Sequence, residues 1–129
     1  MAAIRLGKVQ LRIMQVLWRL GRASAREITE SLNLDTPIAH STVQTLLRKM
    51  EDKGVVSHDA GKRVFVFQPL VDPNSITRSA TEDLIDRMFG GSAAGLVAHL
   101  LADERISKTE LNQLRELIDR HERKKGSKP

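Results

Sequence analysis

The sequence predicts a mainly α-helical protein with a single small β-hairpin, and three observations support this fold class. Apolar residues recur at helical spacing through most of the chain. The pattern changes to that of β-strands only between Gly54 and Pro69. Serine and glycine residues stand where helix starts and stops are expected. We therefore expect three helices and a hairpin in the N-terminal part, and three further helices in the C-terminal part.

The first two helices are predicted from their apolar stripes and from the residues at their ends. The first spans residues 6–20, and Gly21 follows as a helix stop. Trp18 lies on the apolar side and is expected to pack in the core. The second helix begins with a capping box at residues 24–27, where the Ser hydroxyl and the Glu carboxylate bond free backbone N–H groups. It continues to about Asn33.

A third helix, over residues 40–53, is predicted to have one buried side and one polar side. Val43, Leu47 and Met50 share the buried side, and a proline-containing turn at residues 34–38 precedes the helix. The polar side carries hydroxyls, an amide and a guanidinium, which reach base edges and phosphates when a helix enters the major groove. We predict that the following residues bind DNA: Ser41, Thr42, Gln44, Thr45 and Arg48. The alternative is an ordinary amphipathic helix.

A β-hairpin is predicted directly after this helix. Its strands are the β-branched and aromatic runs at residues 55–56 and 64–67, and its tip is the basic turn at residues 59–63. In this position the hairpin is the wing of a winged helix-turn-helix, and we predict that Lys62 and Arg63 bind phosphate oxygens beside the groove. The alternative is an exposed hairpin whose charges prevent aggregation at its edge.

All of the excess positive charge lies in the first half of the chain. Residues 1–71 carry 11 Lys and Arg against 6 Asp and Glu, whereas residues 72–129 carry 10 against 10. Pro69 and Pro73 lie on either side of the point where the charge balance changes. We therefore predict a winged-helix DNA-binding domain over residues 1–71, and a helical domain with a basic tail over residues 72–129. The alternative is a mildly basic protein that binds no polyanion.

The C-terminal domain is predicted to form a homodimer. Three helices in about 50 residues bury little apolar surface within one chain, and their apolar stripes are broad. Two copies can bury these stripes against each other over residues 75–120. The predicted dimerisation residues are Leu84, Met88, Leu96, Leu100, Leu101, Leu111, Leu114, Leu117 and Ile118.

Composition argues against several other classes of protein. The absence of cysteine excludes disulfides and thiolate sites, and 3% aromatic residues cannot supply stacking platforms for RNA. The four histidines fit no metal-ligand spacing, and no glycine loop has the pattern that binds phosphate. We therefore expect no enzyme activity, metal or cofactor. The lack of an apolar run of about 20 residues and of a signal-peptide core predicts a cytoplasmic protein without membrane insertion.

Several segments together resemble the penicillinase-repressor family of the BlaI and MecI type, in the correct order and over nearly the whole chain. They are IMQVLW at 13–18, STVQTLL at 41–47, EDKG at 51–54, GGS at 90–92 and LREL at 114–117. The resemblance implies a bacterial homodimeric repressor that binds an inverted-repeat operator in double-stranded DNA and silences antibiotic-resistance genes, often with those of a membrane sensor protease. That protease is a candidate partner.

The resemblance also implies a candidate cleavage site in the dimerisation domain. His99 and Leu100 stand where drug-responsive members of the family have their scissile Asn-Phe pair. The residues alone leave two other functions open: a winged-helix module that docks a protein partner, and an architectural protein that binds DNA without sequence preference. Salt dependence of binding separates the first from a DNA-binding repressor.

Overall fold

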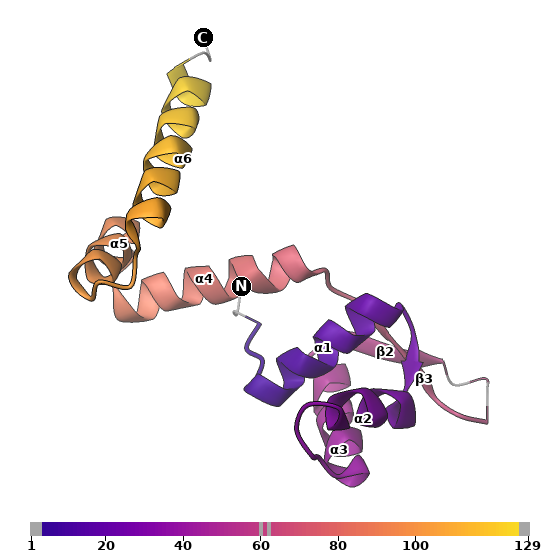
Figure 1. Cartoon of the computed structure of the whole chain (residues 1–129). Coiled ribbons are helices and arrows are strands. Elements are labelled where there is room, and N and C mark those ends of the chain that lie inside the picture. Colours follow the sequence, from indigo (N-terminus) through magenta and orange to yellow (C-terminus); the bar gives the residue numbers. More distant parts are fainter. Residues whose placement is uncertain (1–3, 60, 62, 127–129) are drawn as a thin grey trace. The chain divides into compact units, whose positions relative to one another are not determined.

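The computed structural model describes residues 4–59, 61 and 63–126, and confirms the mainly helical fold class with a small hairpin. By its contacts the chain divides into two compact units, Met1–Asp83 and Leu84–Pro129. The described elements, labelled in Figure 1, are α1 (Lys8–Leu20), β1 (Ala23–Ser24), α2 (Ala25–Asn33), α3 (His40–Asp52), β2 (Val56–Asp59), β3 (Val66–Pro69), α4 (Pro73–Met88), α5 (Ala93–Ala102) and α6 (Lys108–Gly126).

The core of the N-terminal unit forms where the apolar sides of α1, α2 and α3 meet. Leu17 of α1, Ile28 of α2 and Leu47 of α3 are completely buried in one cluster, which Val55 and Val56 extend towards the sheet. Full burial of each such side chain contributes about 1.5–3 kcal/mol. The apolar stripes of the sequence thus orient α3 with its polar side away from the core.

The predicted helix ends are largely confirmed, and one differs. The Ser24 hydroxyl accepts a hydrogen bond from Glu27 N at 3.1 Å, and the Glu27 carboxylate accepts one from Ser24 N at 2.9 Å. Gly54, after α3, has a φ of +79°, a conformation that favours glycine. The first helix begins at Lys8 and not at residue 6, because the side chain of Gln10 accepts a hydrogen bond from Gly7 N at 2.9 Å and caps the helix there.

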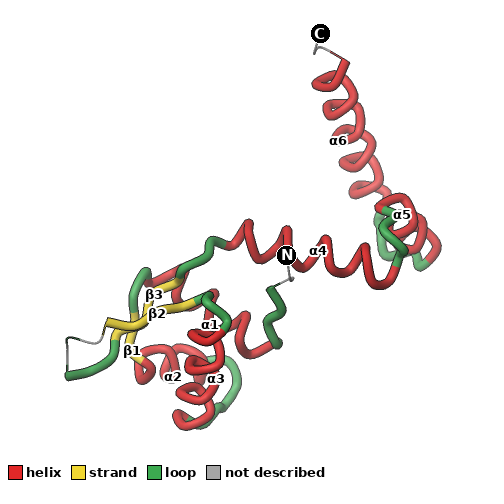
Figure 2. The backbone as a smooth tube through the Cα atoms, turned by 180° about the vertical axis from the view of Figure 1, so that it is seen from behind, coloured by secondary structure: helices red, strands yellow, loops and turns green. Residues whose placement is uncertain are grey.

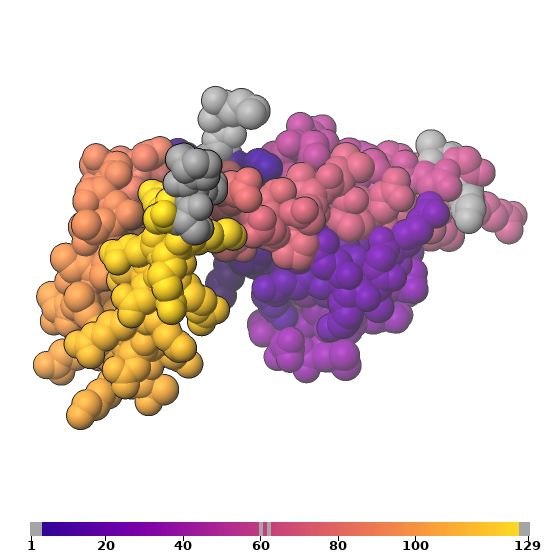
Figure 3. Space-filling view, turned by 90° about the horizontal axis from the view of Figure 1, so that it is seen from above, coloured from indigo at the N-terminus to yellow at the C-terminus, as the bar shows by residue number. Residues whose placement is uncertain are grey.

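The hairpin is confirmed, with strands displaced from the predicted runs. β2 and β3 pair antiparallel, with Val56 opposite Pro69 and Asp59 opposite Val66. This register leaves Val64 and Phe65 before β3, where both are more than half exposed. In the space-filling view, hairpin residues next to the grey atoms project from the packed body of this unit (Figure 3).

A short strand that was not predicted completes the sheet. β1 pairs with the other edge of β3 in the order β1-β3-β2, which Figure 2 shows from behind. The two residues of β1 are too few to display an alternating pattern, and they lie between a helix stop and a capping box. The strand places the start of α2 beside the hairpin.

The N-terminal unit extends beyond the hairpin into the first half of α4. Trp18 is half-buried against the core, and its indole Nε1 donates a hydrogen bond to Val71 O at 2.8 Å. Ile76 is buried, and Ile4 N donates a hydrogen bond to Ser79 Oγ at 2.7 Å. The functional boundary between residues 71 and 72 stays a prediction, and the division by contacts lies between Asp83 and Leu84, within α4.

The helix starts predicted in the C-terminal unit are confirmed, and its apolar stripes lie on the surface. Ser92 Oγ accepts a hydrogen bond from Gly95 N at 2.9 Å, and Ser107 Oγ accepts one from Glu110 N at 3.1 Å. Neither α5 nor α6 contains a buried residue in the described chain. All nine predicted dimerisation residues have exposed or half-buried side chains. None of the described helices has both the length and the apolar character required to cross a membrane.

Candidate DNA-binding surface

The polar side of α3 is accessible along its whole length. The five predicted DNA-binding side chains of this helix are exposed: Ser41, Thr42, Gln44, Thr45 and Arg48. Val43, Leu47 and Met50, on the other side, are completely buried. The apolar side therefore anchors the helix in the core, and the polar side is presented for binding.

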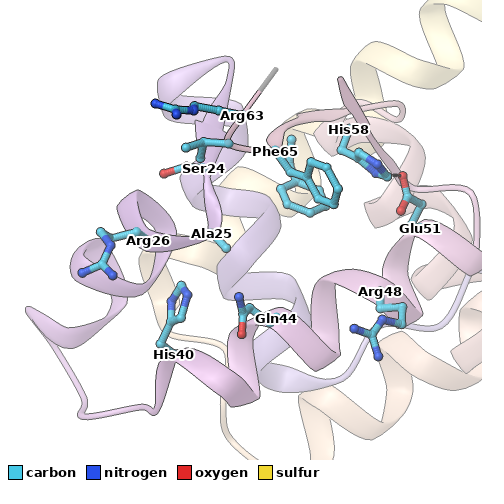
Figure 4. Close-up of a pocket in the computed structure, with 12 residues that line it drawn as sticks. Ser24, Ala25, Arg26, His40, Gln44, Arg48, Glu51, His58, Arg63 and Phe65 are labelled. Carbon is cyan, nitrogen blue, oxygen red and sulfur yellow. Dashed lines mark hydrogen bonds and ion pairs between the residues drawn. The ribbon is translucent and has the colours of Figure 1, made fainter. Parts of the chain in front are cut away.

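An open cavity of about 500 Å³ lies between α3, the start of α2 and the hairpin (Figure 4). We call it the wing groove. Its lining residues are Ser24, Ala25, Arg26, His40, Gln44, Arg48, Glu51, His58, Arg63, Val64, Phe65 and Phe67. The groove is formed within the N-terminal unit, so one copy of this unit supplies all of these side chains.

The predicted site residues divide into two groups in the structure. Gln44, Arg48 and Arg63 line the wing groove together. Ser41, Thr42 and Thr45 are exposed on α3 outside the groove lining, and Thr45 Oγ1 donates a hydrogen bond to Ser41 O at 3.0 Å. Lys62 lies outside the described residues. Two faces of α3 are therefore available to a bound partner.

Three arginines give the wing groove its charge. Arg26 comes from α2, Arg48 from α3 and Arg63 from the hairpin, and Figure 4 shows their side chains spread around the groove. Within the described part of the chain, none of the three has a carboxylate partner. Their positive potential is therefore available to an anion such as a phosphate backbone.

Three arginines of this unit that lie outside the groove are paired with neighbouring carboxylates. Arg5 pairs with Asp83 at 3.3 Å, Arg12 with Asp35 at 3.8 Å, and Arg22 with Asp59 at 3.6 Å. The sequence shows a general excess of positive charge over residues 1–71. These ion pairs reduce the positive charge of this unit outside the wing groove, whereas the three arginines of the groove keep theirs.

Sequence reasoning missed several residues of the groove. Arg26 occupies the first turn of α2, and the first helix of a helix-turn-helix crosses the DNA backbone, so its position could have indicated a role. His40 and Glu51 come from the two ends of α3, whereas His58 and Phe65 come from the hairpin, and no shared motif in the sequence connects them. Among the described residues, no group of three or more His, Cys, Asp or Glu side chains could hold a metal ion.

Comparison with known proteins identifies relatives over nearly the whole chain. The family model described as penicillinase repressor matches residues 6–120. The chain is 24% identical over 121 residues to the penicillinase repressor of Bacillus licheniformis, covering 94% of each chain. It is 23% identical over 108 residues to the methicillin resistance regulatory protein MecI of Staphylococcus aureus strain N315, covering 84% of this chain and 88% of that one.

A solved structure resembles the N-terminal part of the chain. It is the solution structure of the DNA-binding domain of the repressor BlaI, with a TM-score of 0.51 and 28% sequence identity. The match covers 58% of this chain and 93% of that domain. The wing groove thus lies in the part of the chain whose fold is shared with a DNA-binding domain.

Proposed function

This chain belongs to the penicillinase repressor family, whose members are transcriptional repressors and not enzymes, and we propose that it binds an operator as a homodimer. The observation that carries the proposal is the wing groove, where three arginines without carboxylate partners in the described chain surround the polar side of α3. A double-stranded DNA operator supplies both the phosphates and the base edges that such a surface binds.

Each monomer inserts α3 into a major groove in this proposal. Gln44 and Thr45 read base edges, Ser41 and Thr42 bind bases or phosphates, and Arg48 supplies the principal charge. Arg63, with Lys62, anchors the hairpin on phosphate oxygens beside the same groove. The shared fold with a DNA-binding domain supports this placement of the helix and the wing.

The homodimer is proposed because the C-terminal helices expose their apolar stripes. Met88 is 70% exposed and Leu117 is 56% exposed, although solvation of such side chains is unfavourable. A second copy of the chain can cover these stripes. Two α3 helices then read an inverted repeat whose half-sites lie on the order of 10 base pairs apart.

The regulated genes are proposed from the names of the relatives. A penicillinase repressor and a methicillin resistance regulatory protein are among them, which supports antibiotic-resistance genes as targets in the cytoplasm of a bacterium. A membrane sensor protease is the proposed partner for release. His99 and Leu100, the proposed cleavage site, lie within the helix α5, so the helix must open locally before a protease can bind the backbone.

Selection of bound sequences from random duplex DNA, at near-physiological salt, tests the proposal. Enrichment of an inverted repeat is the expected result. Binding without enrichment would favour an architectural DNA-binding protein, and no binding at all would favour a module that docks a protein partner. Affinity for the selected repeat should fall steeply with added salt, since phosphate neutralisation releases counterions.

A further inference from the structure

His40, the first residue of α3, is linked to α2 by a hydrogen bond that determines where its ring proton lies. Thr29 Oγ1 donates a hydrogen bond to Ala25 O at 2.7 Å, and lies 3.1 Å from His40 Nδ1. A hydroxyl has a single proton, and a carbonyl oxygen at 2.7 Å requires that proton because oxygen atoms without one between them repel. Nδ1 of His40 must therefore carry a proton and donate it to Thr29.

This tautomer gives the other ring nitrogen a definite chemistry. In a neutral imidazole with the proton on Nδ1, Nε2 has a lone pair and accepts a hydrogen bond. Nε2 has no hydrogen-bond partner among the residues that the structure describes. Figure 4 shows the His40 ring standing between Arg26 and Gln44, and the residue lines the wing groove. In the neutral ring, a hydrogen-bond acceptor thus lies at the start of α3.

Most of the charged side chains that line the wing groove are hydrogen-bond donors. Arg26, Arg48 and Arg63 have donors only, so they suit phosphates and guanine. The carboxylate of Glu51 is already bonded to His58 at 2.6 Å. A neutral Nε2 cannot bond a phosphate oxygen, because both atoms are acceptors. In the major groove, the donors available to Nε2 are the exocyclic amino groups at N6 of adenine and N4 of cytosine.

We propose that His40 is a base-reading residue, whose Nε2 accepts a hydrogen bond from the exocyclic amino group of an adenine or a cytosine. Thr29 is a positioning residue, because its hydroxyl selects the tautomer and holds the ring plane without contacting DNA. The inference rests on the proposed function. It adds a contact from the first turn of α3, the part of a recognition helix that reaches base edges.

The test compares the base preferences of three variants with those of the wild-type chain, by selection from random duplex DNA. The wild-type chain should select adenine or cytosine at one position of each half-site. His40→Ala should lower that preference about 5- to 150-fold and leave the other positions unchanged. Thr29→Val, which keeps the volume and removes the hydroxyl, should relax the same position. Thr81→Val is the matched control, since Thr81 Oγ1 makes the same type of hydrogen bond, to Thr77 O at 2.7 Å, without a histidine.

Nitrogen NMR of the histidine ring supplies a readout that does not depend on DNA. At about pH 8 the wild-type chain should show His40 protonated at Nδ1, and Thr29→Val should show a mixture of tautomers or the Nε2-protonated form. A wild-type His40 protonated at Nε2 would overturn the inference. A His40→Ala variant that weakens binding to every sequence equally would also overturn it, because the loss of a phosphate contact has that effect.

The two proposals fail in different ways. If the wild-type chain selects no DNA sequence, both the proposed function and the role of His40 are wrong. If it selects an operator and His40→Ala retains every base preference, only the role of His40 is wrong. Thermal unfolding of each variant checks that it is folded, and a Thr29→Val variant that does not fold leaves His40→Ala to decide.

Discussion

His58 of β2 and Glu51 of α3 are joined by a hydrogen bond of 2.6 Å between Nδ1 and Oε2. The ring of His58 also stacks on Phe65, with 4.3 Å between the ring centroids. The pair therefore connects the hairpin to the proposed recognition helix across the wing groove. Since both side chains are partly exposed, we expect the bond to orient the hairpin more than it stabilises the fold.

Removing this connection should weaken DNA binding with a small effect on unfolding. We expect His58→Ala to lower operator affinity, because the hairpin loses its fixed orientation to α3. In a double-mutant cycle with Glu51→Gln, the coupling free energy for DNA binding should be about 1 kcal/mol. Gln68→Ala is the control, since Gln68 bonds Ser57 at 3.1 Å within the hairpin. Additive effects of the two substitutions would show that the bond does not orient the wing.

Arg48 should make the largest single contribution of charge to DNA binding. Arg48→Ala should cost roughly 1–3 kcal/mol if the guanidinium bonds a base, and should reduce the salt slope by about one if it bonds a phosphate. Arg115→Ala, which removes the same charge from an exposed position on α6, serves as the control. Titrations of the operator over a range of salt measure both quantities. Arg48 does not belong to the site if neither quantity changes.

Dimerisation should be part of DNA affinity. Leu100→Asp places a charge in the apolar stripe of α5, and we expect a monomer that binds the full operator about 100-fold more weakly, because the second half-site is no longer tethered. Ala98→Asp introduces the same charge on the opposite side of that helix and should change neither property. Gel-filtration mass and operator affinity, measured together on each variant, test this prediction. A monomer that still binds tightly would contradict the dimer model.

The start of α4 should lose stability in acid. Ser75 N donates a hydrogen bond to Asp72 Oδ1 at 2.7 Å. This bond, followed by that of the Ser75 side chain, lowers the pKa of Asp72 below its ordinary value of 3.8, and Arg78 contributes less.

The sign of the effect follows from this direction. A carboxyl whose pKa is lower in the folded state stabilises the fold above the unfolded pKa, and the stabilisation is lost as the pH falls through the folded value. Asp72→Asn keeps a capping group without a charge. The thermal unfolding temperature should therefore fall more between about pH 6 and pH 2 in the wild-type chain than in this variant. Identical pH profiles would show that Asp72 does not contribute.

The sequence by itself determined the helices, most of their ends and, in the N-terminal unit, their buried sides. These features depend on residues a few positions apart, such as Ser24 and Glu27 in the capping box or Val43, Leu47 and Met50 on one side of α3. Side chains at such spacings meet as soon as the helix forms, so local patterns are sufficient to predict them. The family resemblance followed from the same segments and is confirmed.

Only the tertiary structure decided which side chains meet across elements. It paired Arg22 with Asp59 and left Arg26 and Arg48 without a carboxylate partner in the described chain. The residues next to these arginines in the sequence do not predict which of them is paired. It also brought His40 to Thr29, and added β1 to the sheet. These contacts depend on how the packed core orients separate segments, and no spacing along the chain encodes that orientation.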